Sequence, residues 1–276
     1  MDRKPGAIHP TSTDAPFLQI RGLQARFISH LGELEALDEV SFSVDRGEFV
    51  CLIGPSGCGK STLLRIVAGL IPPTEGEILL EGRPRQLPSS RVGLVFQQPT
   101  LLPWRTVNGN VALPLQMRGV SDQETDRRTS ELLALVGLSD FGNEYPANLS
   151  GGMAQRAAIA RALAQHPELL LLDEPFGSLD AITRERMASE LLRIWEQNHR
   201  TVLMVTHSVE EATLLSDRVV VLSARPGHVV DIVEVSLPRP RSPGMLSSPK
   251  LQAVAQRLRE RLFWGNGGHD VRTKSE

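Results

Sequence analysis

Residues 54 to 61, Gly-Pro-Ser-Gly-Cys-Gly-Lys-Ser, constrain the fold of this chain more than any other stretch. They fit the pattern G-x-x-x-x-G-K-[ST] at every fixed position. The mostly apolar run Glu48 to Ile53 before them has the length of a strand, and Ser61 to Leu70 after them carries helical spacing. Strand, glycine-rich loop and helix thus follow in the order that phosphate binding requires. The stretch is predicted to be a phosphate-binding loop.

The residue types of this loop suit that chemistry. Gly57 and Gly59 let backbone N–H groups turn toward phosphate oxygens, and the start of the following helix adds a positive dipole end. Lys60 can reach the terminal phosphates, and the hydroxyl of Ser61 suits Mg2+. The alternative is a glycine-rich turn without a ligand, which leaves the Lys-Ser pair and its flanks unexplained.

The composition is that of a globular protein. Its 276 residues are 41% hydrophobic, enough for the core of one large α/β domain or of a domain with a helical insert. With 30 basic and 32 acidic residues the formal charge is -2, so no overall attraction to nucleic acid is expected. No apolar run is long enough for a membrane span, and the polar start lacks the apolar core of a secretory signal, so a cytoplasmic chain is expected. Cys51 and Cys58 are expected to be reduced thiols, because a bridge between them would distort the loop.

The first part of the chain is expected to form β structure. Residues 1–16 are predicted to be a disordered arm, because they mix Pro, Thr, Ser, Gly and charges without periodicity. Short alternating segments then predict an antiparallel β layer, with the phosphate loop emerging from its edge. These segments are 17–20, 23–28 and 40–44, the last joined by the turn 45–47 to 48–53, and further short strands are predicted at 77–80 and 91–96.

An inserted α-helical subdomain is predicted at about 98–165. After Gln97 several prolines break up an irregular stretch, and Ser121-Asp-Gln-Glu124 then has the pattern of a capping box before a helical run to Val136. Residues 154–164 are rich in Ala, Arg and Gln, which favours another helix beginning near Gly152.

The remainder predicts a β-α-β unit and a C-terminal extension. The apolar runs 169–172 and 201–205 suit buried parallel strands, and 181–198 between them has helical periodicity. Alternation over 228–235 predicts an edge hairpin with the preceding strand. The main domain is therefore expected at 17–237, followed at 238–276 by a proline-rich linker and a C-terminal helix and tail.

Two further motifs carry chemistry. Four leucines lead into Asp173-Glu174, a pattern typical of the second nucleotide motif of P-loop ATPases, in which an acid holds the magnesium shell and its neighbour can polarise water. A solvated turn is the alternative, but it takes no account of the phosphate loop expected at the same sheet edge.

In Leu149-Ser-Gly-Gly-Met153, Ser150 can cap the next helix while Gly151 and Gly152 expose backbone N–H groups, which predicts a second anion site. Alone, this motif is more often ordinary helix capping.

Taken in order and spacing, these motifs together with Ser178-Leu179-Asp180 and His207 resemble the ATP-binding cassette (ABC) ATPase family. The resemblance covers about residues 17 to 235. It implies an α/β fold: a P-loop ATPase core with a mixed sheet, an antiparallel β subdomain and an inserted α-helical subdomain.

The resemblance also implies roles for individual residues. Glu174 resembles the general base, His207 the switch histidine at the terminal phosphate, and Gln97 the Q-loop residue, so these are the expected catalytic residues. Phe27 lies where members of the family stack an aromatic ring on adenine, although Phe17 is also nearby. The expected nucleotide-binding residues are Phe27, Gly54, Pro55, Ser56, Gly57, Cys58, Gly59, Lys60, Ser61, Thr62, Ser150, Gly151, Gly152 and Asp180, and the expected Mg2+ ligands are Ser61, Gln97 and Asp173.

The function that the resemblance implies is the ATP-hydrolysing subunit of an importer, with ATP and Mg2+ as cofactors. In the family two cassettes stack head to tail, so a homodimer is expected, driving a separate integral membrane permease and serving a substrate-binding protein indirectly, without nucleic acid. The expected location is peripheral, on the cytoplasmic face of the inner membrane. A soluble cassette protein acting on DNA or ribosomes is the alternative, but this chain has neither a long coiled-coil insertion nor a second cassette. A P-loop kinase or GTPase would leave Leu149 to Met153 without a role.

Two stretches point to a subgroup and a partner. Ser223-Ala-Arg-Pro-Gly227 and Leu101-Leu-Pro-Trp-Arg105 resemble the nitrate, sulfonate and taurine importers. In relatives a short cytoplasmic helix of the permease sits beside the Q-loop, so the apolar cluster around Trp104 is predicted to contact the permease. The alternative is that Trp104 packs inside the helical subdomain.

Overall fold

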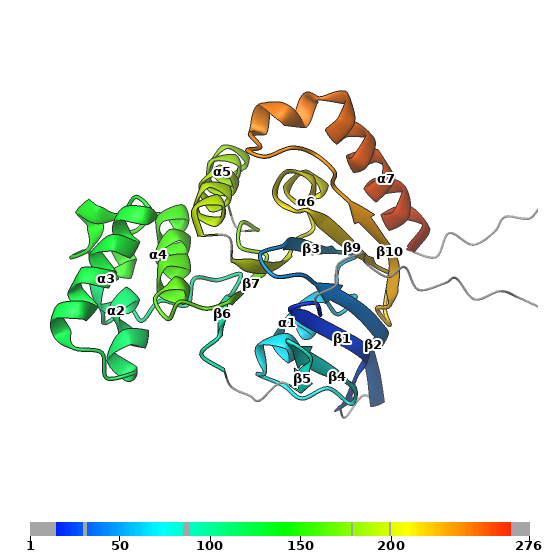
Figure 1. The fold of residues 1–276 in the computed structure, drawn as a ribbon, viewed down its shortest axis with the longest axis horizontal. Helices are drawn as coiled ribbons and strands as arrows, with labels where there is room; N and C mark the ends of the chain where they lie inside the picture. Colours follow the sequence, from blue (N-terminus) through cyan, green and yellow to red (C-terminus); the bar gives the residue numbers. More distant parts are fainter. Residues whose placement is uncertain (1–14, 30–31, 85–88, 178, 199, 266–276) are drawn as a thin grey trace, which may run out of the picture.

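The computed structural model describes residues 15–29, 32–84, 89–177, 179–198 and 200–265, and contains two β-sheets with helices around them (Figure 1). Of the expected N-terminal arm, residues 1–14 lie outside the described part. The α/β fold with a mixed sheet, an antiparallel sheet and an inserted group of helices confirms the expected fold class.

The central sheet has six strands in the order β10-β9-β3-β8-β7-β6. Their bounds are β3 Phe49–Ile53, β6 Val92–Val95, β7 Leu169–Asp173, β8 Thr201–Val205, β9 Arg218–Leu222 and β10 Val229–Glu234. All neighbours are parallel except β10, which pairs antiparallel with β9 at one edge, as the alternation over 228–235 predicts. The strands β3, β7 and β8 are buried along their whole length, because helices or the second sheet cover both faces.

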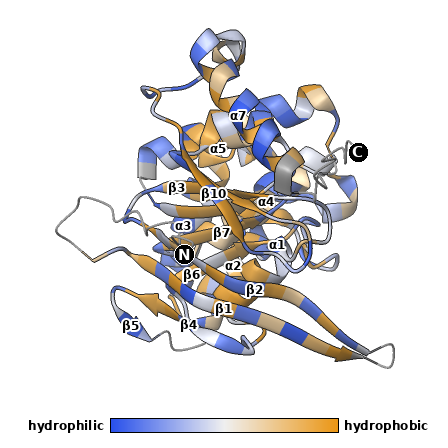
Figure 2. Cartoon of the chain, turned by 90° about the vertical axis from the view of Figure 1, so that its right-hand side faces the viewer, coloured by the Kyte–Doolittle hydropathy of each residue, from blue (hydrophilic) through white to orange (hydrophobic). Residues whose placement is uncertain are grey.

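The second sheet is antiparallel, in the order β2-β1-β4-β5. Its strands are β1 Leu18–Ser29, β2 Gly32–Val44, β4 Glu75–Leu80 and β5 Arg83–Pro84. The two segments expected at 17–20 and 23–28 form one strand with register shifts near Leu23. In Figure 2 orange and blue residues alternate along β1 and β2, which fits a sheet with one covered and one exposed face.

The expectation that the phosphate loop leaves the edge of the antiparallel layer is wrong. The turn after Val44 carries the chain from β2 into the other sheet, where β3 pairs with β8 on one side and β9 on the other. The reason is burial: Val50 and Leu52 face one core cluster, whereas Phe49, Cys51 and Ile53 face another. A strand with apolar groups on both faces belongs inside a covered sheet.

Three helices form the inserted subdomain beside the central sheet: α2 Val107–Met117, α3 Asp122–Leu135 and α4 Gly151–Leu163 (Figure 1). Helix α2 lies within the stretch expected to be irregular. Thr106 caps it by accepting a hydrogen bond from the Gly109 N–H at 3.2 Å. Pro114 lies inside the helix.

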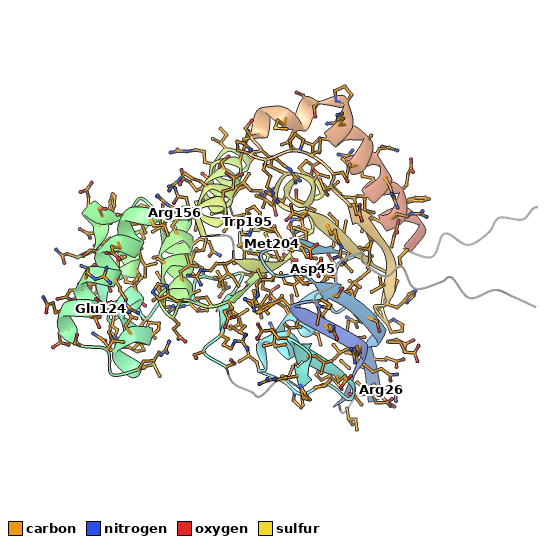
Figure 3. The ribbon with its side chains drawn as sticks, viewed as in Figure 1. Arg26, Asp45, Glu124, Arg156, Trp195 and Met204 are labelled. Atoms are coloured by element: carbon orange, nitrogen blue, oxygen red, sulfur yellow. The ribbon has the colours of Figure 1, made fainter. Side chains whose placement is uncertain are left out.

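The predicted capping box at Ser121 does not form. Ser121 precedes α3, but its side chain makes no capping hydrogen bond. The Glu124 carboxylate instead pairs with Arg127 and Arg128, because these guanidiniums lie three and four residues along the same helix face. Figure 3 places Glu124 on the outer side of this subdomain, far from Met204 in the central sheet.

The remaining helices cover the central sheet. Their bounds are α1 Lys60–Ala68, α5 Ala181–Asn198, α6 Val209–Leu215 and α7 Pro249–Gly265, with short 3-10 turns at Ser139–Phe141, Pro146–Asn148 and Pro243–Ser247. Trp195 on α5 packs edge-on against Phe49, with ring centroids 5.8 Å apart. Helix α7 buries Leu251 and Leu258, and Leu258 joins the core cluster on this side of the sheet.

Both cysteines are free and buried. Among the described residues no helix has the length and apolarity to cross a membrane.

Candidate functional site

The loop from Gly54 to Gly59 connects β3 to α1 in the middle of the central sheet. Lys60 is buried, and its ammonium donates hydrogen bonds of 2.9 Å to the carbonyls of Gly54 and Pro55. Gly59 has φ +99°, and a Cβ there would lie 2.6 Å from the Ala36 carbonyl oxygen, so only glycine fits. The loop is therefore folded around the lysine and pressed against β2.

A pocket of about 260 Å3 opens beside this loop. The expected site residues in its lining are Phe27, Ser56, Gly57, Gly59, Lys60, Ser61, Thr62 and Glu174. The other expected loop residues, Gly54, Pro55 and Cys58, do not line it; burial raises the pKa of the Cys58 thiol. Of the two candidate aromatics, Phe27 reaches the pocket with 39% of its surface exposed, whereas Phe17 is buried under Arg46 and Arg91.

The structure brings Asp173 to the start of α1. The Ser61 hydroxyl donates to Asp173 Oδ1 at 2.8 Å, although the two residues come from different motifs. Burial raises the pKa of Asp173, and the hydrogen bond from Ser61 opposes that effect. Two oxygen atoms of the kind that Mg2+ prefers thus lie together at the edge of the pocket.

Glu174 follows β7 and lies beside side chains that follow β6 and β8. Its Oε2 lies 3.4 Å from Gln97 Nε2, after β6, and 3.4 Å from His207 Nδ1, after β8. The Glu174 side chain is partly exposed, and that of His207 is about half exposed. Parallel strands end at the same edge of a sheet, which is why these residues, distant in sequence, converge.

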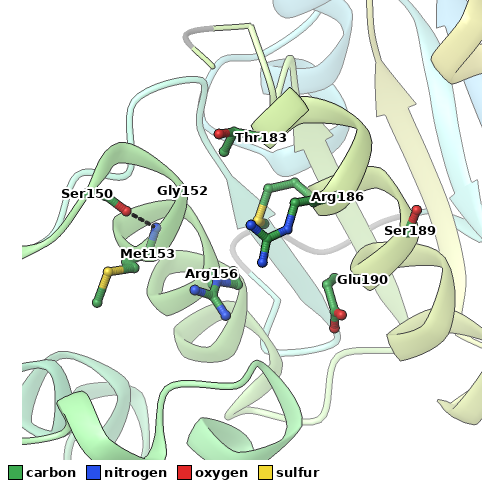
Figure 4. A pocket seen from close by; sticks show the side chains of 9 residues that line it. Ser150, Gly152, Met153, Arg156, Thr183, Arg186, Ser189 and Glu190 are labelled. Atoms are coloured by element: carbon green, nitrogen blue, oxygen red, sulfur yellow. Dashed lines mark hydrogen bonds between the residues drawn. The ribbon is translucent and has the colours of Figure 1, made fainter. Parts of the chain in front are cut away.

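Ser150 lies elsewhere, at the start of α4. Its hydroxyl accepts a hydrogen bond of 3.3 Å from the Met153 N–H, as expected of a helix cap (Figure 4). Ser150 and Gly152 line a second pocket, of about 360 Å3, between α4 and α5, and Gly151 beside them is exposed. This pocket shares no lining residue with the one at the phosphate loop. Within one chain the two expected anion sites are therefore separate.

Asp180 lies just before α5. Its Oδ1 accepts a hydrogen bond of 3.0 Å from the Thr183 N–H. The Thr183 side chain and then this N–H lower the pKa of the Asp180 carboxyl. Ser178, expected to belong to the same motif, lies outside the described residues.

Sequence reasoning missed two features of the site. Arg225, in the turn between β9 and β10, lines the pocket of the phosphate loop. Glu211 on α6 is buried behind His207, where it accepts a hydrogen bond from the Thr206 hydroxyl, and burial raises its pKa. The acid four residues after His207 was a visible signal for the second feature, whereas no local pattern marks the first.

This chain is similar in sequence and in fold to known proteins. The family model described as ABC transporter matches residues 37–177. An uncharacterized ABC transporter ATP-binding protein of Methanocaldococcus jannaschii is 50% identical over 224 residues, covering 81% of this chain and 84% of that protein. An aliphatic sulfonates import ATP-binding protein of Bacillus cereus is 42% identical over 248 residues, covering 90% of this chain and 96% of that protein. A dimeric ATP-binding cassette solved in a post-hydrolysis state with ADP and Pi is similar with a TM-score of 0.70 and 33% identity, covering 80% of this chain and 100% of that one.

Proposed function

The chain belongs to the ABC transporter family, and from this premise we propose that it is the ATP-hydrolysing subunit of an importer. It is an ABC ATPase, which converts ATP and water to ADP and phosphate. The observation that carries the proposal is the convergence of Gln97, Glu174 and His207 beside the phosphate loop. The neighbouring sites for phosphate, metal and a water-activating carboxylate are the parts that such a reaction needs.

The residues at the loop fit a magnesium nucleotide. Lys60 and the backbone N–H groups around Gly57 and Gly59 bind phosphates, and Phe27 at the rim offers its ring to adenine. Ser61 Oγ and Asp173 Oδ1 would hold Mg2+, with Gln97 as a further ligand. Bound Mg2+ neutralises charge on the phosphates.

Glu174 acts as the general base. Its Oε2 accepts the proton of the attacking water, while Gln97 and His207, each 3.4 Å from that oxygen, orient the carboxylate, and His207 also contacts the terminal phosphate. The half-exposed His207 side chain is free to adjust when the site closes.

The working unit is a homodimer in which each ATP is closed between two chains. Ser150 and Gly151 are exposed at a helix start outside the pocket of the phosphate loop, with Gly152 buried beside them, so a second copy can present this helix start to the nucleotide. Asp180, which accepts a hydrogen bond from Thr183 of the second pocket, contributes to the same interface. The dimeric cassette to which this chain is similar supports that arrangement.

The importer complex places the dimer on the cytoplasmic face of the cell membrane, bound to an integral permease that a substrate-binding protein supplies. The transported compounds are of the nitrate, sulfonate or taurine type, in keeping with the sulfonate import protein that is 42% identical.

A growth experiment tests this proposal. A strain deleted for the chain is supplied with taurine, another alkanesulfonate, nitrate or sulfate as the sole sulfur or nitrogen source. We expect it to fail on at least one organic sulfonate or on nitrate, and to be rescued by the wild type but not by Lys60→Ala. Normal growth on all these sources would contradict the assigned substrate type. Rescue by Lys60→Ala would contradict the dependence of transport on this site.

A further inference from the structure

The turn between β9 and β10, residues 223–228, has no part in the proposed function, yet it lies against the phosphate loop. Arg225 Nε donates to the Gly57 carbonyl at 3.0 Å. A Cβ on Gly227 would lie 2.1 Å from the Cys58 carbonyl oxygen, so only glycine allows this approach. The turn and the loop are therefore in direct contact at two points.

Backbone hydrogen bonds to β2 also hold the turn in place. The Gly227 N–H donates to the Ala36 carbonyl, and the Asp38 N–H donates to the Gly227 carbonyl, each at 3.0 Å. Inside the turn the buried Ser223 hydroxyl accepts the His228 N–H at 3.0 Å. These bonds fix the backbone on both sides of Arg225, so its guanidinium is positioned before any ligand arrives.

Arg225 has hydrogen-bonding capacity left over. Within the part of the chain that the structure describes, its hydrogen bond is the one from Nε, and neither Nη group has a hydrogen-bond or ion-pair partner. Arg225 lines the same pocket as Lys60 and Ser61, where the one acidic side chain is Glu174. An exposed cation at the mouth of a pocket built for phosphates can donate two more hydrogen bonds in a planar fork, which matches phosphate geometry.

We propose that Arg225 is a nucleotide-binding residue of this ATPase: its Nε holds the Gly57 carbonyl, and its Nη groups donate to phosphate oxygens of the bound nucleotide. The inference rests on the proposed function of the site. It gives the Ser-Ala-Arg-Pro-Gly turn a role as a third wall of the pocket, beside the phosphate loop and β1. Because the contact forms with the ground-state nucleotide, it contributes to affinity and leaves turnover at saturating ATP nearly unchanged.

The test compares ATP and ADP binding by calorimetry for the full chain and four variants: Arg225→Gln, Arg225→Lys, Lys60→Ala and Arg21→Gln. Arg21 is an exposed arginine of β1, ion-paired with Glu77, that does not line the pocket, so it controls for loss of surface charge. We expect Arg225→Gln to weaken both nucleotides about 10- to 100-fold, as for a lost hydrogen bond to a charged group, with KM raised and kcat retained. Arg225→Lys keeps the charge without the fork and should fall between, whereas Arg21→Gln should bind like the wild type.

Melting curves of the nucleotide-free proteins separate binding from support of the loop. We expect Arg225→Gln to melt with the wild type when no nucleotide is present. Unchanged nucleotide affinity in Arg225→Gln, or an affinity loss accompanied by a lower melting temperature of the nucleotide-free variant, would overturn the proposal. If the wild type binds no ATP, the proposed function itself fails. Suppose that the wild type binds ATP and Lys60→Ala does not. A wild-type affinity in Arg225→Gln would then contradict the role of Arg225 and leave the proposed function standing.

Discussion

Glu174 has a backbone conformation that residues other than glycine rarely adopt. Its φ is +44°, in the left-handed region, and two hydrogen bonds hold it there: its N–H donates to the Val205 carbonyl at 2.9 Å, and its carbonyl accepts the Gly177 N–H at 3.0 Å. Such strain persists where the surrounding structure determines it and is common at functional sites. Here it directs the carboxylate toward Gln97 and His207.

The first prediction concerns this carboxylate. Glu174→Gln keeps the size and the hydrogen bonding of the side chain but removes the proton acceptor, so the variant should bind ATP while turnover falls about a hundredfold or more. Phosphate release and ATP binding on the same preparation measure both quantities. Glu131→Gln, on the exposed face of α3, is the control and should hydrolyse at the wild-type rate. Hydrolysis near the wild-type rate by Glu174→Gln would remove Glu174 from the role of base.

At this scale the sequence predicted contacts that follow from strand ends and missed those made by loops. The meeting of Ser61 with Asp173 follows from two motifs that sit at the carboxyl ends of strands in one sheet. The contact between Arg225 and Gly57 joins residues 168 positions apart through a turn, and neither hydrophobic periodicity nor a motif encodes it. The turn follows β9 and the loop follows β3, and these two strands are neighbours in one sheet, but the order of strands in a sheet is not visible in a single sequence.

Among the elements, α2 shows why local signals misled. Pro114 and the prolines before it predict an irregular stretch, but a helix forms. Its first turn is held by the Thr106 cap and by Asn110, whose buried amide donates to the carbonyls of Leu102, Arg105 and Thr106. By contrast α5, β7 and β8 begin and end close to their predicted bounds, because long apolar periodicity and uniform burial identify them.

The segment that leads to α7 is anchored by one buried arginine. Arg241 Nη1 donates to the Ser216 carbonyl at 2.6 Å, and Nη2 donates to those of Val235 and Leu237 at 2.9 and 3.1 Å. Burial lowers the pKa of Arg241 to about 10, so the guanidinium stays charged at neutral pH. The predicted linker is therefore bonded to the ends of α6 and β10.

The second prediction tests this anchor. Arg241→Met leaves several buried carbonyls without donors and should lower the free energy of unfolding by about 3 kcal/mol. Arg259→Met removes an exposed ion pair between α7 and Glu210 and should cost less than about 1 kcal/mol. Urea denaturation of both variants gives the comparison. Equal, small losses would show that the buried guanidinium does not anchor the segment.

For the whole molecule, the exposure of Trp104 bears on the proposed contact with a permease. Trp104 is 71% exposed, so the alternative that it packs inside the helical subdomain is wrong. Arg105 beside it donates to Gln116 Oε1 at 2.8 Å, which places this stretch next to the end of α2, where Met117 is 80% exposed. Two large apolar side chains at the surface offer an apolar contact to a partner.

The third prediction follows. Trp104→Ala should leave the melting temperature and the ATPase activity of the isolated subunit nearly unchanged, yet weaken permease binding in a pull-down and slow transport. Trp195→Ala is the contrasting variant, because truncation of a buried tryptophan should cost about 3 to 5 kcal/mol of stability. Full retention of permease binding and transport by Trp104→Ala would contradict the contact.

The dimer that closes ATP between two chains is the central claim, and the molecular mass with and without ATP tests it most directly. Light scattering compares Glu174→Gln, which traps ATP, with the double variant Glu174→Gln, Ser150→Arg, in which a bulky side chain at the start of α4 blocks the partner's nucleotide. We predict that ATP doubles the mass of the first protein, whereas the second binds ATP as a monomer because its own phosphate loop is intact. An ATP-induced dimer of the double variant, or no change of mass in either protein, would contradict the account.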